Sequence, residues 1–392
     1  MSDNTKDDSL PYGCQNLDNR DIEAVTDVLN SSFLTTGPSV EAFETELCRL
    51  TGAEYAVACA NGTAALHLAC MAAGVSTNDL GVTSPISFLA SANCIEHCKG
   101  QVDFIDIDPV SLCISLNALE LYCSENNIPK VVIPVDFAGT PADLPGMKLL
   151  SEKYGFLLIE DAAHALGSTY EFDGKSYACG SCAHTDMAIF SFHPVKTVTT
   201  GEGGAVMTND ATLAKRLRRL RNHGMERTKD TLAQQGGWYY EMTGLGFNYR
   251  LTDIQCALGI SQIAKLEDFK KKRQRIVSEY NNAFCNRDDL ILPPKDLQAN
   301  ACPHLYPIRI KKGDILRRKV YEKLREDKIF CQIHYIPIYW QPYYVEKYGY
   351  KKGKCPIAET YYDQTLSLPL FPGMTDSNVK RVIDRFLLAV GQ

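Results

Sequence analysis

Short apolar runs alternate with amphipathic stretches along most of the chain. The runs have the length of buried strands, and they occupy residues 55–60, 102–107, 131–135, 156–159, 187–192 and 204–208. Apolar residues recur with a helical period in several of the gaps, as at 144–154 and 213–221. Strands that alternate with helices predict an α/β domain whose sheet is mainly parallel and covered by helices.

Two helices are expected before the first of these strands. Asp18 is the expected cap of the first helix, and Ser39 is the expected cap of a second that ends at Gly52. The apolar face of the first helix, which we expect to point inward, consists of Ile22, Val25, Val28 and Leu29.

The pattern changes beyond residue 250. Residues 251–284 predict one long helix or two abutting helices. The elements expected after it are strands at 305–310 and 330–334 and helices at 315–327 and 377–390. We therefore expect three parts, an N-terminal segment (1–37), a large domain (38–262) and a smaller α+β domain (263–392).

Charge and composition exclude several classes of protein. The chain has 392 residues, of which 45% are apolar and 22% charged, as in ordinary globular proteins. A net charge of −6 disfavours a nucleic-acid-binding protein, because such proteins usually have a basic surface. Residues 55–75 contain no Asp, Glu, Lys or Arg and have the length of a membrane span, but Asn61-Gly62-Thr63 interrupts them. A strand, a turn and a buried helix are expected there, and no membrane span.

The 15 cysteines are an odd number scattered through the chain. The first residues are acidic and polar, unlike a signal peptide, so we expect reduced thiols and a cytoplasmic protein. Cys179 and Cys182 have CxxC spacing with His184 nearby, but a zinc site would need a second ligand pair at suitable spacing. We therefore expect no metal site.

The first segment that could bind a ligand is Asn61-Gly62-Thr63, where a strand is expected to end and a helix to begin. The free N–H groups and the dipole at a helix N-terminus attract a phosphate. Gly62 permits close approach of the backbone, and the Thr63 hydroxyl adds a donor. An ordinary helix cap explains the same residues.

The second segment ends an apolar strand with Glu160 and Asp161, followed by His164. An acid at a buried strand end needs a partner, and a protonated pyridine nitrogen would be one. A structural ion pair or a metal ligand are the alternatives. His164 either contacts the phenolate side of such a cofactor or fills polar space.

The third segment carries Lys196 just past a buried strand, before a loop rich in Thr and Gly. Burial makes a lysine amine neutral and nucleophilic, as a Schiff-base lysine requires. Ser191 could hold a phosphate oxygen, and we expect a packing role for His193.

These segments together resemble a known family. The motifs that carry the resemblance, in chain order, are NGTAAL (61–66), SFLASAN (87–93), EDAAHALGS (160–168), FSFHPVK (190–196), GEGGAVMTND (201–210), RNHGM (221–225) and GFNYRLTDIQ (246–255). The set is similar to the sugar aminotransferases named after their DegT, DnrJ, EryC and StrS members, from about Tyr12 to the C-terminus. It implies the cofactor pyridoxal 5′-phosphate (PLP) and fold type I, that of aspartate aminotransferase, in which a large, mainly parallel sheet domain precedes a smaller α+β domain.

The resemblance implies roles for individual residues. Lys196 is similar to the lysine that forms the Schiff base with PLP, and Asp161 to the aspartate that pairs with the pyridine nitrogen and keeps the ring an electron sink. The further cofactor contacts that it implies are Gly62, Thr63 and Ser191 at the phosphate and Phe88 on the ring. Asn248 is similar to a residue that reaches the phosphate from the neighbouring subunit, which implies a homodimer with shared active sites.

Within the family, the chain most resembles the UDP-sugar aminotransferases of the pseudaminic-acid pathway, through pieces such as PISF (85–88), VDFAG (135–139) and HYIPI (334–338). This implies amino transfer from L-glutamate to a UDP-linked 2-acetamido-4-keto-6-deoxy hexose. One wall of the sugar site is implied at Tyr12 and at Ser32, Phe33, Leu34 and Thr35. Because a nucleotide sugar needs polar groups spread along a cleft between domains, we expect the other wall at Gln332, His334 and Tyr335. Arg250 is the candidate cation for the donor's carboxylate, unless it only braces the Asn248 loop.

Other interpretations remain open at this point. The substrate could be another nucleotide-linked keto-sugar, of the perosamine or 4-amino-4-deoxyarabinose type. Some relatives are sugar dehydratases without the Schiff-base lysine, and Lys196 argues against that reaction. A PLP-fold sensor without catalysis would have no need for Lys196, Asp161 and a phosphate site together. For His334 and Tyr335, ordinary strand packing is the competing explanation.

Overall fold

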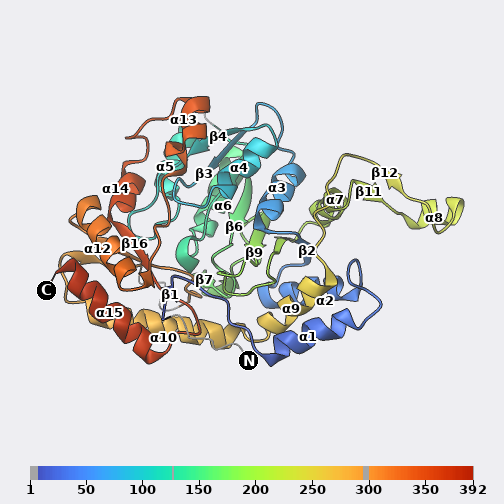
Figure 1. Ribbon diagram of the computed structural model, residues 1–392. Coiled ribbons are helices and arrows are strands. Elements are labelled where there is room, and N and C mark those ends of the chain that lie inside the picture. The colour runs from blue at the N-terminus through green and yellow to red at the C-terminus, as the bar shows by residue number, and fades with distance from the viewer. Residues whose placement is uncertain (1–7, 126–127, 295–299, 392) are drawn as a thin grey trace.

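A computed structural model describes residues 8–125, 128–294 and 300–391 (Figure 1). A seven-stranded sheet runs through the large domain in the order β2-β10-β9-β6-β5-β3-β4. All of its strands run parallel except β10, which is antiparallel to both neighbours. The strands are β2 (Tyr55–Cys59), β3 (Leu80–Thr83), β4 (Gln101–Phe104), β5 (Val131–Ile133), β6 (Leu157–Asp161), β9 (Met187–Ser191) and β10 (Gly204–Thr208). The predicted α/β fold with a mainly parallel sheet is confirmed.

Helices flank this sheet (Figure 1). They are α2 (Pro38–Thr51), α3 (Gly62–Ala72), α4 (Ala90–His97), α5 (Leu116–Ser124), α6 (Leu144–Tyr154) and α7 (Ala211–Arg221). Helix α3 is buried on nearly every side, which accounts for the absence of Asp, Glu, Lys and Arg from residues 55–75. Within the described ranges, no helix is long and apolar enough to cross a membrane. The polar first residues, 1–7, lie outside those ranges.

Two abutting helices, α9 (Asp253–Ile263) and α10 (Leu266–Phe284), lead into the C-terminal part. This part holds a three-stranded antiparallel sheet of β13 (Leu290–Ile291), β14 (Tyr306–Ile310) and β16 (Thr365–Leu368). Its helices are α12 (Asp314–Glu326), α13 (Pro342–Tyr348), α14 (Pro356–Gln364) and α15 (Asp376–Val390). The domain boundary placed at residues 262 and 263 stays a prediction.

Short elements complete the chain. They are β1 (Leu10–Pro11), η1 (Phe137–Gly139), β7 (Thr169–Phe172), β8 (Lys175–Ala178), β11 (Met225–Glu226), α8 (Lys229–Gln235), β12 (Glu241–Met242), β15 (Ile329–Phe330) and η2 (Ile338–Trp340). The pair β1 and β15 is parallel and attaches the N-terminal segment to the C-terminal part. The strand expected at 330–334 is therefore wrong beyond Phe330. Beyond Phe330 the chain no longer pairs with β1, and the β-bridge that the structure shows over 331–334 joins Gln332 to Ser367.

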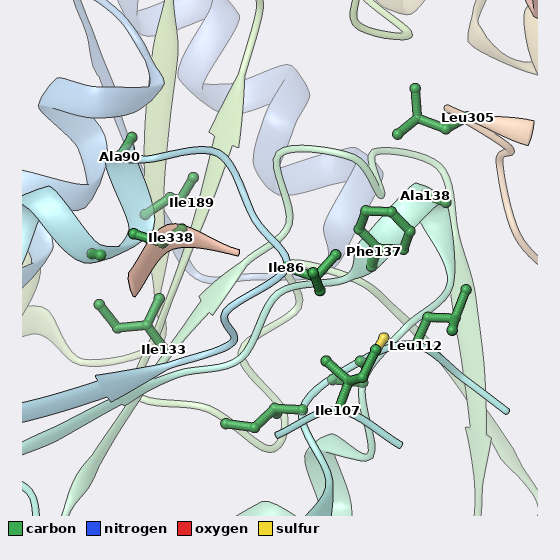
Figure 2. Close-up of a cluster of buried hydrophobic side chains, with 14 of the residues drawn as sticks. Ile86, Ala90, Ile107, Leu112, Ile133, Phe137, Ala138, Ile189, Leu305 and Ile338 are labelled. Atoms are coloured by element: carbon green, nitrogen blue, oxygen red, sulfur yellow. The ribbon is translucent and has the colours of Figure 1, made fainter. Parts of the chain in front are cut away.

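The core joins the two parts of the chain. Figure 2 shows Ile86, Ile133 and Ile189 of the large domain in one buried cluster with Leu305 and Ile338 of the C-terminal part. The Ile338 N–H also donates to the Pro85 carbonyl at 3.0 Å. This shared core fixes the C-terminal segment that follows β15 against the chain that leaves the carboxyl end of β3.

Helix α1 (Asn19–Leu29) departs from its predicted orientation. Asp18 is its N-cap, as expected. Ile22 and Leu29 are 63% and 56% exposed, so the predicted inward face is wrong at these two positions, whereas Val28 is buried as expected. The helix packs on α9, and polar contacts hold its first turn. Asp21 is buried and accepts hydrogen bonds from Lys265, Gln262 and Ser261.

The start of α2 also differs from the prediction. The N-cap is Gly37 and Pro38 is the first helical residue, so Ser39 is not the cap. The Gly37 and Ser39 N–H groups donate to the Asp253 carboxylate. A residue distant in sequence therefore accepts the free N–H groups at the start of the helix. A cap supplied by tertiary contact leaves no local sequence signal.

Replacing Asp21 with alanine should destabilise the protein by about 3–5 kcal/mol, because the buried Lys265 ammonium loses its principal partner. The free energy of unfolding in urea measures the effect. Asp27→Ala, on the exposed side of the same helix, is the matched control and should change stability by less than about 0.5 kcal/mol. Similar losses in the two variants would contradict this account of how α1 docks.

Candidate active site

Most of the predicted site residues meet in one cavity of about 610 Å³ at the carboxyl ends of the parallel strands. The large domain contributes Gly62, Thr63, Phe88, Asp161, His164, Ser191 and Lys196. The N-terminal segment and the loop after β15 contribute Tyr12, Gln332, His334 and Tyr335. Because the strands are parallel, their carboxyl ends lie at one edge of the sheet, and segments far apart in sequence meet there.

The N-terminus of α3 forms one end of the cavity. The Asn61 side chain caps the helix by accepting the Ala64 N–H at 2.8 Å. A Cβ atom on Gly62 would lie only 2.8 Å from the Ser191 Cβ, so a glycine is needed for the helix to begin this close to β9. The Ser191 hydroxyl thereby adjoins the first turn of α3. Unpaired N–H groups, a helix dipole and a hydroxyl together suit a phosphate.

Asp161, the last residue of β6, is buried in the cavity wall. Its Oδ2 accepts a hydrogen bond from the Ser91 hydroxyl at 2.6 Å, and its Oδ1 accepts the Ala163 N–H at 3.2 Å. Burial raises the pKa of the carboxyl, while these two bonds and the charge of Lys196 oppose the rise. No basic side chain of the described chain makes an ion pair with it. A cationic group on a ligand would supply the missing partner.

Lys196 lines the same cavity in the loop after β9. Burial lowers the pKa of its amine from 10.5 to about 8, and the Asp161 carboxylate limits the shift by favouring the charged form. A larger share of this amine is therefore neutral near pH 7 than of an exposed lysine. A neutral amine can attack an aldehyde carbon.

His164 has a fixed tautomer when neutral. Its Nδ1 accepts the Ala138 N–H at 3.3 Å, so the proton resides on Nε2, which lies 3.3 Å from the Tyr335 hydroxyl. Burial, and then the nearby Lys196, hold the pKa of His164 well below its ordinary value. His304 is buried with its ring centroid 4.5 Å from that of His164. Sequence reasoning missed His304, because no motif or period marks it.

His334 and Tyr12 form the opposite wall. The ring centroids of the two residues are 5.2 Å apart, and His334 Nδ1 lies 2.9 Å from the Ser367 hydroxyl. Burial lowers the pKa of His334 to about 3, with a further contribution from Lys196. His334 is therefore a neutral hydrogen-bonding group at physiological pH. His193 is exposed and lines the cavity, so the packing role expected for it is wrong.

The remaining predicted residues do not line this cavity. Arg250 borders a second cavity of about 710 Å³ together with several other arginines, and its Nη1 donates to Asn222 Oδ1 at 2.6 Å. Asn248 forms an isolated bridge with the same Asn222. The Ser32-Phe33-Leu34-Thr35 turn attaches to this region through a bridge from Thr35 to Thr252. Within one chain, these residues form a separate group.

The structure also brings together Asp136, Glu160 and Cys179, a set of possible metal ligands that was not expected. Gly180 donates its N–H to both Glu160 oxygens. Burial raises the pKa of Asp136 to about 6 and that of Glu160 well above its usual range. These shifts are those of a close pair of buried acids, which can share one proton when no cation lies between them. Near Cys182, His184 pairs with the Tyr170 hydroxyl at 2.8 Å.

A ligand that satisfies the first cavity carries an aldehyde for Lys196, a ring cation for Asp161 and a phosphate for the start of α3. PLP has all three groups, and the residues present fit it. The fold and the site thus define a PLP-dependent enzyme of fold type I.

Comparison with known proteins specifies the class further. The chain belongs to the DegT/DnrJ/EryC1/StrS aminotransferase family, whose model matches residues 15–387. It is 36% identical to the spore coat polysaccharide biosynthesis protein SpsC of Bacillus subtilis, over 96% of this chain and 95% of that protein. It is also 36% identical to a UDP-4-amino-4,6-dideoxy-N-acetyl-beta-L-altrosamine transaminase of Campylobacter jejuni, over 96% of each.

A solved structure agrees with these relatives. Helicobacter pylori PseC, described as an aminotransferase involved in the biosynthesis of pseudoaminic acid, matches with a TM-score of 0.88 and 30% identity. The match covers 97% of this chain and 99% of that one. The predictions of the family, the fold, the PLP cofactor and aminotransferase activity are confirmed.

The reactivity of Lys196 in the cofactor-free protein should rise through about pH 8, where its amine loses its proton. Pulse labelling with an amine-reactive reagent, followed by peptide mass spectrometry, gives the midpoint of this rise. Exposed lysines should titrate at about pH 10.4. Asp161→Ala should shift the midpoint downward, because it removes a charge that favours the protonated amine. A midpoint like that of the exposed lysines, or an upward shift in the variant, would contradict the arrangement.

Proposed function

We propose that this enzyme uses PLP to transfer the amino group of L-glutamate to the 4-keto carbon of a UDP-linked 2-acetamido-4-keto-6-deoxy hexose. The observation that carries the proposal is the composition of the cavity. Its large-domain wall offers what PLP requires, and its opposite wall offers polar and aromatic groups of Tyr12, Gln332, His334 and Tyr335. Such a wall suits a hydroxyl-rich substrate. The relatives named for sugar and polysaccharide biosynthesis support this choice of substrate.

The residue roles follow from the geometry. Bound PLP supplies an electron sink for the negative charge that develops when a proton leaves the amino acid. Lys196 would hold the cofactor and, as a free amine, move that proton. Asp161 would keep the ring nitrogen protonated. Gly62, Thr63 and Ser191 would bind the phosphate.

Phe88 and His164 would position the ring. Phe88 is 57% exposed and lines the cavity. A planar ring stacked on it would cover that surface. The Nε2 proton of His164 would meet the oxygen substituent of the ring, with Tyr335 as its hydrogen-bonding neighbour.

A homodimer would complete the site. Asn248, Arg250 and residues 32–35 lie away from the cavity of their own chain, and we propose that they enter the cavity of the partner. The neighbouring arm, residues 225–245, projects from the body of the molecule (Figure 1). It exposes Trp238, Met242 and Leu245 by 64% or more. Large apolar side chains that gather on such a surface are typical of protein interfaces.

The substrate is tested with purified enzyme, L-glutamate and a panel of nucleotide-linked keto-sugars. The panel includes the keto precursors of perosamine and 4-amino-4-deoxyarabinose. We expect formation of 2-oxoglutarate together with a 4-amino sugar, and the highest kcat/KM for the UDP-linked 2-acetamido-4-keto-6-deoxy hexose. A preference of tenfold or more, about 1.4 kcal/mol, for another sugar would overturn the proposed specificity.

His334→Ala should raise the KM for the keto-sugar about tenfold, the usual effect of removing one polar contact. The rate of the glutamate half-reaction, followed by stopped-flow absorbance, should stay near that of the wild type, because that step depends on Asp161 and Lys196. His184→Ala, outside the cavity, is the matched control and should alter neither half-reaction. Equal damage to both half-reactions in His334→Ala would indicate a structural role for this histidine.

A further inference from the structure

The strand end that carries Asp161 does not by itself fix the charge or the orientation of the carboxylate. We propose that Ser91, supported by Ser87, is a positioning residue that keeps Asp161 ionised and oriented toward the cofactor's ring nitrogen. This proposal rests on the function proposed above for Asp161. It adds a role for α4, a helix that carries none of the cofactor-binding residues predicted from the sequence.

The direction of the hydrogen bonds follows from the donors available. Ser91 is buried in the first turn of α4, with its Oγ 2.6 Å from Asp161 Oδ2 and 2.6 Å from the Ser87 Oγ. An ionised carboxylate only accepts, and a hydroxyl has one proton to donate. Ser91 therefore donates to Asp161, and Ser87 must donate to Ser91. The series of hydrogen bonds that runs from Ser87 through Ser91 therefore ends on the carboxylate of Asp161.

The two oxygens of Asp161 are thus held from different elements. Oδ2 takes the proton of Ser91 on α4, and Oδ1 takes the Ala163 N–H of the turn after β6. Two donors on two sides fix the plane of the carboxylate. Asp161, Ser87 and Ser91 all line the cavity, so the remaining lone pairs of the carboxylate are accessible to a ligand.

Neutral donors suit this position better than a basic side chain would. Burial favours the uncharged form of Asp161, and the Ser91 hydrogen bond counteracts it. A permanent cation beside the carboxylate would also hold it ionised, but it would compete with the ring cation for the same oxygens. Hydroxyl donors stabilise the negative charge without forming an ion pair with it, so the charge stays available to the cofactor.

The binding of two cofactor forms to the cofactor-free protein tests the proposal. The probes are PLP and its 1-deaza analogue, in which a CH group replaces the ring nitrogen. Ser91→Ala should weaken PLP binding about 10- to 100-fold, the range expected when a hydrogen bond to a charged group is lost. Binding of the analogue should be nearly unchanged, because it makes no ionic contact with Asp161. Ser91→Thr, which keeps the hydroxyl, should retain the preference for PLP.

Three further variants make the outcome decisive. Ser84→Ala removes a buried hydroxyl that bonds only within its own turn, and it should behave like the wild type. Ser87→Ala should show a smaller loss that is also selective for PLP, and it serves if Ser91→Ala does not fold. Asp161→Ala should abolish the preference for PLP over the analogue.

These variants distinguish a failure of the role proposed for Asp161 from a failure of the role proposed for the serines. If Asp161→Ala leaves the preference intact, the role proposed for Asp161 is wrong, and the proposal for Ser91 falls with it. If Asp161→Ala abolishes the preference while Ser91→Ala weakens both ligands equally, or neither, then only the positioning role of the serines is overturned.

Discussion

The constraint on which this site depends is a buried carboxylate that makes no ion pair with a basic side chain in the described part of the chain. Asp161 sits where the apolar strand β6 ends, in surroundings that favour its neutral form. The charge becomes stable only if donors hold it and a cation meets it. The protein supplies the donors from α4 and from the turn after β6, and the cation must come from the ligand. A pyridine ring that is protonated at its nitrogen answers this requirement directly.

The same burial acts in the opposite sense on Lys196. Removing its amine from water lowers the pKa, and the Asp161 charge keeps the shift moderate. The histidines at 164, 304 and 334 are all held neutral by burial and by the nearby lysine. Apart from the exposed Glu202, the cavity therefore concentrates its ionic character in one acid and one amine. The parallel sheet makes this possible, because it brings the ends of β2, β6 and β9 to one edge.

Much of this could be predicted from the sequence, because periodicity and strand-end chemistry are local signals. The strands around Lys196 and Asp161 and the turn at Gly62 were expected within a few residues of where they lie. Contacts between distant segments leave no such signal. The polar docking of α1 through Asp21, the cap of α2 supplied by Asp253, the short β15 and the contact of His304 with His164 all depend on tertiary partners. Ser91 stood inside a recognised motif, but only the structure shows that its hydroxyl meets Asp161.

The protonation state of the ring nitrogen in the assembled enzyme tests the central claim most directly. Enzyme reconstituted with PLP that carries ¹⁵N in its ring can be examined by NMR at neutral pH, with Asp161→Asn as the comparison. The ¹⁵N chemical shift should be that of a protonated pyridine in the wild type and should move toward that of the neutral ring in the variant. A neutral ring nitrogen in the wild type, or a protonated one in both proteins, would contradict the account.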